Sequence, residues 1–176
     1  MVMKNRMWAV CVGIGWLLAN SGYVLAGAPN TDFAAVTNTK YAKECGACHL
    51  AYQPGLLPER SWRKVMENLH DHFGDNAELP TADQQALVEY LVNNSAERAN
   101  YKRSAQMLHS IRKVDTPVRI SQVPYFIREH REVANRVRGN EKIKSLGQCE
   151  LCHQKANEGS YAENEIRVLG AESWND

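Results

Sequence analysis

The sequence predicts an all-α protein built as two small helical lobes. Apolar residues recur at helical spacing in several stretches, and no stretch shows the strict alternation that is typical of a β-strand. Glycine, proline and asparagine interrupt these stretches and predict short helices. A five-residue pattern, C-x-x-C-H, occurs twice, at 45–49 and at 149–153. Since one copy lies in each half of the chain, each lobe is expected to form around one copy.

The repeated pattern is the attachment sequence of c-type haem. Its two cysteines each reach one vinyl group of the same porphyrin, and the histidine that follows offers an imidazole nitrogen to the iron. Two copies therefore predict two covalently bound haem c groups, each with its own proximal histidine. The residues are Cys45, Cys48 and His49 in the first copy and Cys149, Cys152 and His153 in the second.

Two other chemistries also use paired cysteines. A zinc site needs four ligands, and two C-x-x-C pairs are enough to supply them, so the count alone leaves zinc open. The histidine that directly follows both pairs favours haem, because zinc has no need of it there. A thioredoxin-like dithiol needs a βαβ context, and neither copy has a strand-like run beside it.

An amino-terminal signal peptide is predicted over residues 1–26. It opens with Lys4 and Arg6, continues as an apolar stretch from Met7 to Leu18, and ends in a small-x-small sequence before Gly27. The apolar stretch is short for a membrane span, which favours cleavage over an uncleaved anchor. We therefore expect a periplasmic mature protein without a stable membrane anchor.

The overall charge of the chain does not indicate a particular class of partner. The chain has 21 Lys and Arg residues against 20 Asp and Glu residues, and this balance gives no indication of nucleic-acid binding. Residues 98–119 stand out, with one acidic side chain, Asp115, among many basic ones. They form an ordinary solvated face, a set of partners for haem propionates, or a docking surface for an acidic redox partner. The basic residues are Arg98, Lys102, Arg103, Arg112, Lys113 and Arg119.

The amino-terminal haem lobe is predicted to span residues 27–95 and to resemble a small cytochrome c. A helix over 41–48 leads into the first attachment pattern, and a second helix is expected from Pro58 to Phe73 on the spacing of its apolar residues. Thr81 and Gln84 have the spacing of a capping box and predict the start of a third helix, which ends near Asn93.

A basic helix and an extended connector are predicted over residues 96–122, with the helix ending near Val114. The carboxy-terminal haem lobe follows at 123–176. Its main helix is expected to start at Pro124, which suits a first helical turn, and to end at Gly139-Asn140.

The ligand on the opposite face of each iron decides the reduction potential and access to small molecules. The chain beyond His153 contains neither methionine nor histidine, so the second haem needs a ligand from upstream. His130 is favoured because it lies in the middle of an apolar helical stripe, although a core histidine bonded to a carbonyl is the ordinary explanation there. For the first haem the choice lies among His70, His72 and Met66, with a slight preference for His72 on helical phase, and His109 is expected on the surface.

Sequence blocks outside the two attachment patterns add to this interpretation. They are 50–58, Ser61-Trp62-Arg63, His72-Phe73-Gly74-Asp75, Arg119-Ile120, Tyr125-Phe126, Glu129-His130-Arg131, Ala156, Glu158 and Gly159. With the two patterns, these blocks resemble the bacterial dihaem cytochrome c family of small exported electron carriers. The similarity covers nearly the whole chain after the signal peptide.

This resemblance implies an all-helical protein with two bis-histidine haems that serve electron transfer. It implies His72 and His130 as distal ligands without deciding which haem each one serves, and it suggests Trp62 as a residue that packs on haem. The implied partners are redox proteins, such as a membrane cytochrome b or a small oxygen-binding haem protein.

Three functions are compatible with a chain of this kind. A periplasmic electron-transfer protein needs two six-coordinate irons and little else. A small dihaem peroxidase or reductase needs one open iron position and a shaped substrate pocket, for which the mature chain leaves little room. A gas sensor needs a signalling module, and the sequence shows none. The electron carrier is therefore favoured, and no catalytic residue is predicted.

Overall fold

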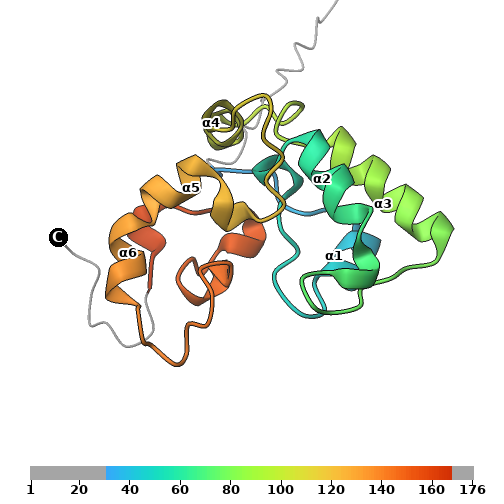
Figure 1. Cartoon of the computed structure of the whole chain (residues 1–176). Helices are drawn as coiled ribbons and strands as arrows, with labels where there is room; N and C mark the ends of the chain where they lie inside the picture. The colour runs from blue at the N-terminus through green and yellow to red at the C-terminus, as the bar shows by residue number, and fades with distance from the viewer. Residues whose placement is uncertain (1–30, 168–176) are drawn as a thin grey trace, which may run out of the picture.

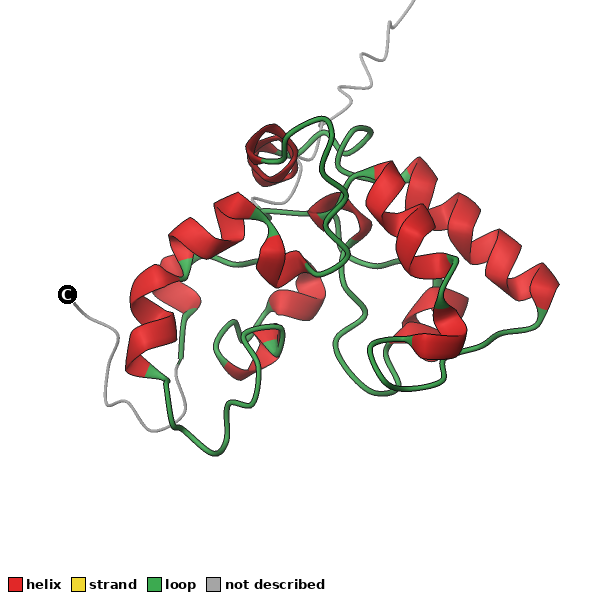
Figure 2. Cartoon of the chain, in the orientation of Figure 1, coloured by secondary structure: helices red, strands yellow, loops and turns green. Residues whose placement is uncertain are grey.

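The structure, a computed structural model, describes residues 31–167, and within this range it is helical and has no strands (Figure 2). The all-α prediction is confirmed. The predicted signal peptide lies outside the described residues. The α-helices are α1 (Thr39–Cys45), α2 (Glu59–Met66), α3 (Thr81–Asn93), α4 (Lys102–Ser110), α5 (Pro124–Glu129) and α6 (Arg131–Arg136). Short 3₁₀ turns occur at Pro54–Leu56, Leu69–Asp71, Ile120–Gln122, Cys149–Leu151, Ala156–Glu158 and Glu163–Glu165.

Helices α1, α2 and α3 form one lobe, and α5, α6 and the chain that follows them form the other (Figure 1). In the first lobe α2 packs against α3. Helix α4 packs against α5 and against the turn Pro54–Leu56, so it joins the two lobes. Gly55 allows α4 to lie this close to the turn, because a Cβ atom at position 55 would lie only 2.5 Å from Ser104 Oγ.

The second helix is shorter than the apolar spacing predicts. It ends at Met66 rather than near Phe73, and a 3₁₀ turn follows. The carbonyl of Leu69 accepts a hydrogen bond from Ala77 N at 2.8 Å and so closes a loop over residues 69–77. If the helix continued to Phe73, the Leu69 carbonyl would instead bond to Phe73 N. His72 therefore lies on a tight turn within the loop 69–77 instead of on a helix face.

The capping box predicted at Thr81 is wrong. Pro80 is the N-cap and Thr81 is the first helical residue, with no side-chain capping bond. The side chain of Gln84 instead donates to Met66 O at 2.6 Å. That carbonyl is one of the last in α2, where no helical partner remains. Gln84 thus joins two helices rather than capping its own.

Helix α4 is also shorter than predicted, because its ends are used in tertiary contacts. On the amino-terminal side Ala96 N donates to Leu57 O in the first lobe at 3.0 Å. On the carboxy-terminal side Ser110 Oγ donates to Met107 O and accepts from Tyr125 N. The helix predicted from Pro124 does begin there, but it breaks at His130, which separates α5 from α6.

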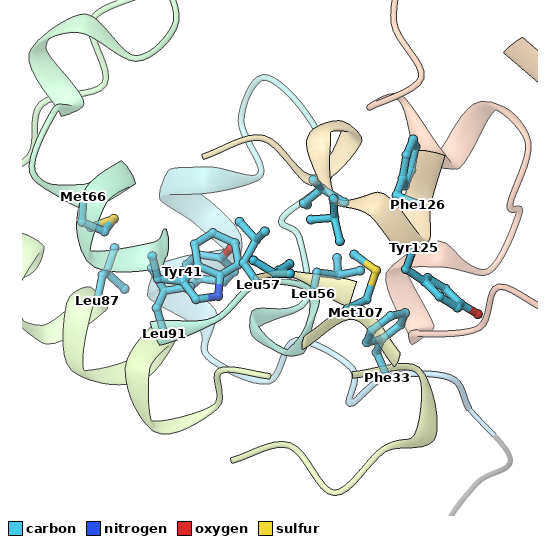
Figure 3. Close-up of a cluster of buried hydrophobic side chains, with 14 of the residues drawn as sticks. Phe33, Tyr41, Leu56, Leu57, Met66, Leu87, Leu91, Met107, Tyr125 and Phe126 are labelled. Atoms are coloured by element: carbon cyan, nitrogen blue, oxygen red, sulfur yellow. The ribbon is translucent and has the colours of Figure 1, made fainter. Parts of the chain in front are cut away.

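Buried apolar side chains form one cluster that runs through both lobes (Figure 3). It extends from Met66 and Leu87 in the first lobe through Leu57 to Met107 and Phe126 on the side of the second lobe. A shared core means that the lobes are expected to fold together rather than as independent units.

The described amino-terminal residues pack on the second lobe. Gly159 O accepts hydrogen bonds from Asp32 N and Phe33 N, both at 3.0 Å. Asp32 also forms an ion pair with Arg103 and accepts from Tyr161 N at 2.7 Å. The start of the described chain is therefore part of the environment of the second attachment pattern.

Candidate haem centres

The first centre consists of His49 and His72, which face each other. The chain leaves α1 at Cys45 and turns through the attachment pattern to His49. His72 comes from the turn that follows α2. The two ring centroids are 6.2 Å apart and the ring planes are inclined by 23°. Of the candidates for the first haem, His72 is therefore the one that the structure brings to the proximal histidine.

The second centre has the same composition and a different geometry. His153 follows the 3₁₀ turn Cys149–Leu151, and His130 lies at the break between α5 and α6. Their ring centroids are 6.1 Å apart, and the ring planes are inclined by 70°. The structure thus brings the ring of His72 to His49 and that of His130 to His153.

Both separations fit one iron between two imidazoles. A metal–imidazole nitrogen bond is about 2.0 Å long. A five-membered ring with bonds of about 1.33 Å has a radius of about 1.1 Å. Two imidazoles on opposite sides of one metal ion therefore have centroids about 6 Å apart. The observed 6.2 and 6.1 Å agree with this value.

Backbone carbonyls fix the protonation of two of the four rings. Nδ1 of His49 lies 2.7 Å from Leu50 O, and Nδ1 of His130 lies 2.9 Å from Phe126 O. A carbonyl oxygen only accepts, so in both rings Nδ1 carries the proton and Nε2 has a lone pair for a metal. Such outer hydrogen bonds also raise the basicity of a ligating imidazole.

The proximal histidine of the second centre lacks such a bond. Nδ1 of His153 is buried and has no hydrogen-bond partner among residues 31–167. Burial is the main cause that lowers the pKa of His153 to about 4, and the neighbouring His130 and Arg103 lower it further. Burial also lowers the pKa of His72 and of His130. These rings are neutral near pH 7, and the neutral imidazole is the form that binds a metal.

Of the cysteines in the two patterns, Cys149 is buried, Cys45 and Cys152 are half-buried, and Cys48 is exposed. Burial raises the pKa of Cys45 to about 11 and that of Cys149 to about 12, and it also raises the pKa of Cys152. Reactive dithiols of the thioredoxin type have lowered pKa values. The environment of these thiols therefore does not favour the dithiol interpretation.

His72 is held by a tight turn that contains a strained residue. His72 N donates to Asp75 O at 2.7 Å, and between them Phe73 has φ 61° and Gly74 has φ 107°. Positive φ at both central positions is the pattern of a type I′ turn, and for phenylalanine it is unfavourable. The ring of Phe73 is 44% exposed, and the Arg119 guanidinium lies 3.8 Å from its centroid.

A cavity of about 520 Å³ adjoins the second imidazole pair. Its volume lies within the range of cofactor sites, about 300–1,000 Å³. Both thiols and both histidines of the centre line it, together with apolar side chains and several cations. The cations are Arg103, Arg128 and Arg131, and haem propionates need partners of this kind. The donor set and the space around it therefore fit a covalently attached haem.

No sequence pattern singled out the two tyrosines that lie against the proximal histidines. The ring of Tyr52 stacks on His49 with centroids 4.8 Å apart and an inclination of 21°. The ring of Tyr161 lies 5.1 Å from that of His153, inclined by 58°. Burial raises the pKa of Tyr52 to about 12, so its hydroxyl remains a proton donor at neutral pH. The sequence signals were weak: Tyr52 lies three positions after His49, within the block 50–58, and Tyr161 lies eight positions after His153.

The remaining candidate residues lie away from the imidazole pairs or in the core. His70 and His109 are exposed, and Met66 is buried in the apolar cluster. Trp62 is also in that cluster, and its Nε1 donates to Pro54 O at 2.7 Å. Its contact with haem stays a prediction.

Within residues 31–167, no three His, Cys, Asp or Glu side chains gather in an arrangement that could hold a metal ion. The same part of the chain contains no helix that is long and apolar enough to cross a membrane.

Comparison with known proteins agrees with the geometry. Residues 41–161 match the family described as dihaem cytochrome c. A dihaem cytochrome c from Rhodobacter sphaeroides is 40% identical, with a TM-score of 0.65 over 73% of this chain and 99% of that one. The dihaem cytochrome c of Shewanella baltica OS155 is 34% identical, with a TM-score of 0.65 over 78% of this chain and 98% of that one.

A structure of DHC purified from Rhodobacter sphaeroides is also similar, with 33% identity and a TM-score of 0.55 over 72% of this chain and 99% of that one. Comparison with curated proteins gives no match. The family match covers well over half of the chain, and the two attachment patterns lie within it. The prediction of two haem c groups is confirmed, and the protein belongs to the dihaem cytochrome c family.

Proposed function

We propose that the protein is an electron carrier in which two histidines bind each iron, His49 with His72 and His130 with His153. The observation that carries this proposal is the spacing of the ring centroids, 6.2 Å in the first centre and 6.1 Å in the second. With both axial positions taken by protein ligands, neither iron has a free site for a substrate. This arrangement favours electron transfer over catalysis on a bound small molecule.

Each haem, when bound, supplies a one-electron Fe(III)/Fe(II) couple. The residues of the chain hold its ligands in place, because His49 and His130 are oriented by carbonyls and His72 by a closed turn. Fixed ligands change little between the two oxidation states, which suits rapid electron exchange. Two imidazoles per iron also predict potentials below those of cytochromes with histidine and methionine ligands.

Carbon monoxide tests the coordination directly. The reduced protein is expected to show the same visible spectrum with and without carbon monoxide, because six-coordinate haem has no position for it. A large spectral change at one haem would contradict the proposal and would support the alternative function, a small peroxidase or reductase with an open iron position.

Near-infrared magnetic circular dichroism of the oxidised protein tests the ligand type. Bis-histidine haem and histidine–methionine haem give charge-transfer bands at different wavelengths. We expect only the bis-histidine band from both haems. A methionine band would contradict the ligand assignment and would direct attention to Met66 or Met107, which are buried in the core cluster.

The compartment is part of the same proposal. We infer export to the periplasm from the predicted signal peptide, residues 1–26. Haem-stained protein is expected in the periplasmic fraction of producing cells, with an amino terminus at Gly27. Recovery with the membrane fraction after a salt wash would contradict cleavage.

We propose an acidic redox protein as the partner, such as an acidic membrane cytochrome b or small haem protein. Much of the basic charge of residues 98–119 is paired: Arg98 lies 2.7 Å from Glu59 and Arg112 2.7 Å from Asp115. Lys102 and Lys113 are exposed, and their charges are the ones that we expect to attract an acidic partner. Steering by such charges weakens as salt screens them.

A salt series tests this docking surface. In stopped-flow electron transfer, Lys102→Glu with Lys113→Glu is expected to lower the rate at low salt and to reduce its dependence on ionic strength. Lys142→Glu, an exposed charge reversal in the second lobe, is the matched control. Docking at residues 98–119 would be contradicted if Lys142→Glu lowered the rate as much as the double variant did. It would also be contradicted if the wild-type rate did not depend on ionic strength.

A further inference from the structure

Each tyrosine that lies against a proximal histidine is anchored in the opposite lobe. Tyr52, stacked on His49, donates its hydroxyl hydrogen at 2.8 Å to the carbonyl of Gly147, two residues before the second attachment pattern. Tyr161, against His153, donates to Gln53 Oε1 at 2.6 Å, directly after Tyr52. The two links cross between the lobes in opposite directions.

Both anchors are well defined. Gln53 is fully buried, and its two polar atoms are both used, since Oε1 accepts from Tyr161 and Nε2 donates to Ala156 O. Gly147 O also accepts from Cys149 N at 2.9 Å, so the anchor of Tyr52 belongs to the backbone that carries the second haem. Buried polar groups of this kind resist displacement, because breaking either bond would leave a buried donor or acceptor without a partner.

We propose that Tyr52 and Tyr161 are positioning residues through which each lobe sets the orientation of the proximal imidazole in the other lobe. A ring packed against an imidazole limits its rotation about the metal–nitrogen bond, and the anchored hydroxyl fixes the ring. The orientation of an axial imidazole influences the energies of the iron orbitals that it contacts. A change near one haem therefore alters the spectroscopic properties and potential of the other.

This inference rests on the proposed bis-histidine ligation, and it predicts that a substitution in the first lobe affects the haem of the second. Gln53 belongs to the first lobe in sequence, four positions after His49, yet it anchors the tyrosine of the second centre. Gln53→Met is therefore expected to shift the signals of the haem at His153. Tyr52→Phe, which keeps the stacked ring and removes only the hydroxyl, is expected to shift the signals of the haem at His49.

The experiment uses the full chain with both haems attached. Electron paramagnetic resonance and a spectroscopically monitored redox titration are recorded for wild type, Tyr52→Phe, Tyr161→Phe and Gln53→Met. His72→Ala and His130→Ala assign the signals, because each removes one low-spin species. The expected shift is about threefold in the reduction equilibrium of the affected haem, which is about 30 mV for one electron.

Tyr90→Phe is the matched control. Tyr90 is a half-buried tyrosine of the first lobe that packs on Tyr41 with centroids 5.3 Å apart, and within residues 31–167 its ring does not lie against a histidine ring. The variant is expected to leave both haem signals unchanged. Equal shifts in Tyr90→Phe and Tyr52→Phe would overturn the inference, since the effect would then be a general response to a lost hydroxyl.

Thermal unfolding separates positioning from simple joining of the lobes. If the three variants only lower the melting temperature, and both haems keep their g values and potentials, the tyrosines are structural links and the inference is wrong. If Tyr161→Phe and Gln53→Met both shift the g values and the potential of the same haem, the inference is supported. Failure of the proposed function would be visible earlier, as a high-spin or methionine-bound haem in the wild-type protein.

Discussion

At the first haem centre the planes of His49 and His72 are inclined by 23°, whereas at the second those of His130 and His153 are inclined by 70°. The outer hydrogen bonds are also placed differently. In the first centre the proximal ring is bonded to a carbonyl, and in the second it is the distal ring. The same attachment pattern thus occurs beside two differently arranged histidine pairs, and the surrounding fold determines which arrangement forms.

The local backbone explains part of this difference. The first pattern begins at the end of α1, and the side chain of Asn38 caps the start of this helix by accepting a hydrogen bond from Tyr41 N at 2.9 Å. The second pattern instead begins with the 3₁₀ turn Cys149–Leu151. The second centre depends more on distant segments, including Asp32 and Phe33. The two haems are therefore expected to respond differently to the same kind of change.

Removal of a distal histidine is expected to have the largest effect and to separate the two centres. In His130→Ala one haem should bind carbon monoxide while the other stays six-coordinate, and in His72→Ala the roles should reverse. Covalent attachment should persist in both, because the thioether bonds need only the cysteines. Difference spectra of the reduced variants measure this, with His109→Ala as an exposed control. Unchanged spectra in His130→Ala would contradict the pairing.

The ferric wild-type protein is expected to give two distinct low-spin signals in electron paramagnetic resonance. Ligand planes inclined by 23° keep the two relevant iron orbitals well separated and predict a rhombic signal for the first centre. Planes inclined by 70° bring these orbitals closer and predict a strongly anisotropic, low-field signal for the second. Two identical rhombic signals would show that the attached haems equalise the ligand geometry.

Substitution of Gly159 tests the dependence of the second centre on the amino-terminal segment. Gly159 has φ 83°, and a Cβ atom there would lie 2.3 Å from Phe33 O. Gly159→Ala is expected to lower the free energy of unfolding by about 1–3 kcal/mol from the backbone conformation and by more from the clash. Gly139→Ala is the control, because it has φ 85° and open space. Equal losses in denaturant unfolding would mean that the Phe33 contact contributes nothing.

The smallest expected effect compares one cation–π contact in each lobe. The Arg119 guanidinium lies 3.8 Å from the ring centroid of Phe73, beside His72, and that of Arg128 lies 4.8 Å from the ring centroid of Tyr125. Arg119→Gln is expected to lower the free energy of unfolding by about 0.5–1 kcal/mol, the usual size for an exposed pair. Arg128→Gln should cost less because its contact is longer. The reverse order in thermal unfolding would contradict this ranking.

The cofactor and the helical class could be predicted from local sequence. Cys45, Cys48 and His49 act on one porphyrin because they are neighbours in the chain, so their chemistry needs no knowledge of the fold. Apolar spacing likewise predicted the start of the helix at Pro124, where proline suits the first turn. These features depend on contacts within a few residues.

Helix ends were predicted less well, because competing tertiary hydrogen bonds decide them. The helix expected to reach Phe73 ends at Met66, and the helical phase used for His72 does not exist there. His72 nevertheless lies opposite His49, since a closed turn presents it from the end of α2. For His130 a helix break replaces the continuous stripe that was expected.

The sequence by itself determined that the chain has two attachment patterns, two proximal histidines and a helical fold, since each follows from short-range spacing. Only the tertiary structure decided which imidazoles face each other, how their planes are inclined, and that Tyr52 and Tyr161 cross between the lobes. These contacts join residues as far as 108 positions apart. Closing such loops depends on the shared apolar core, whose packing no local pattern specifies.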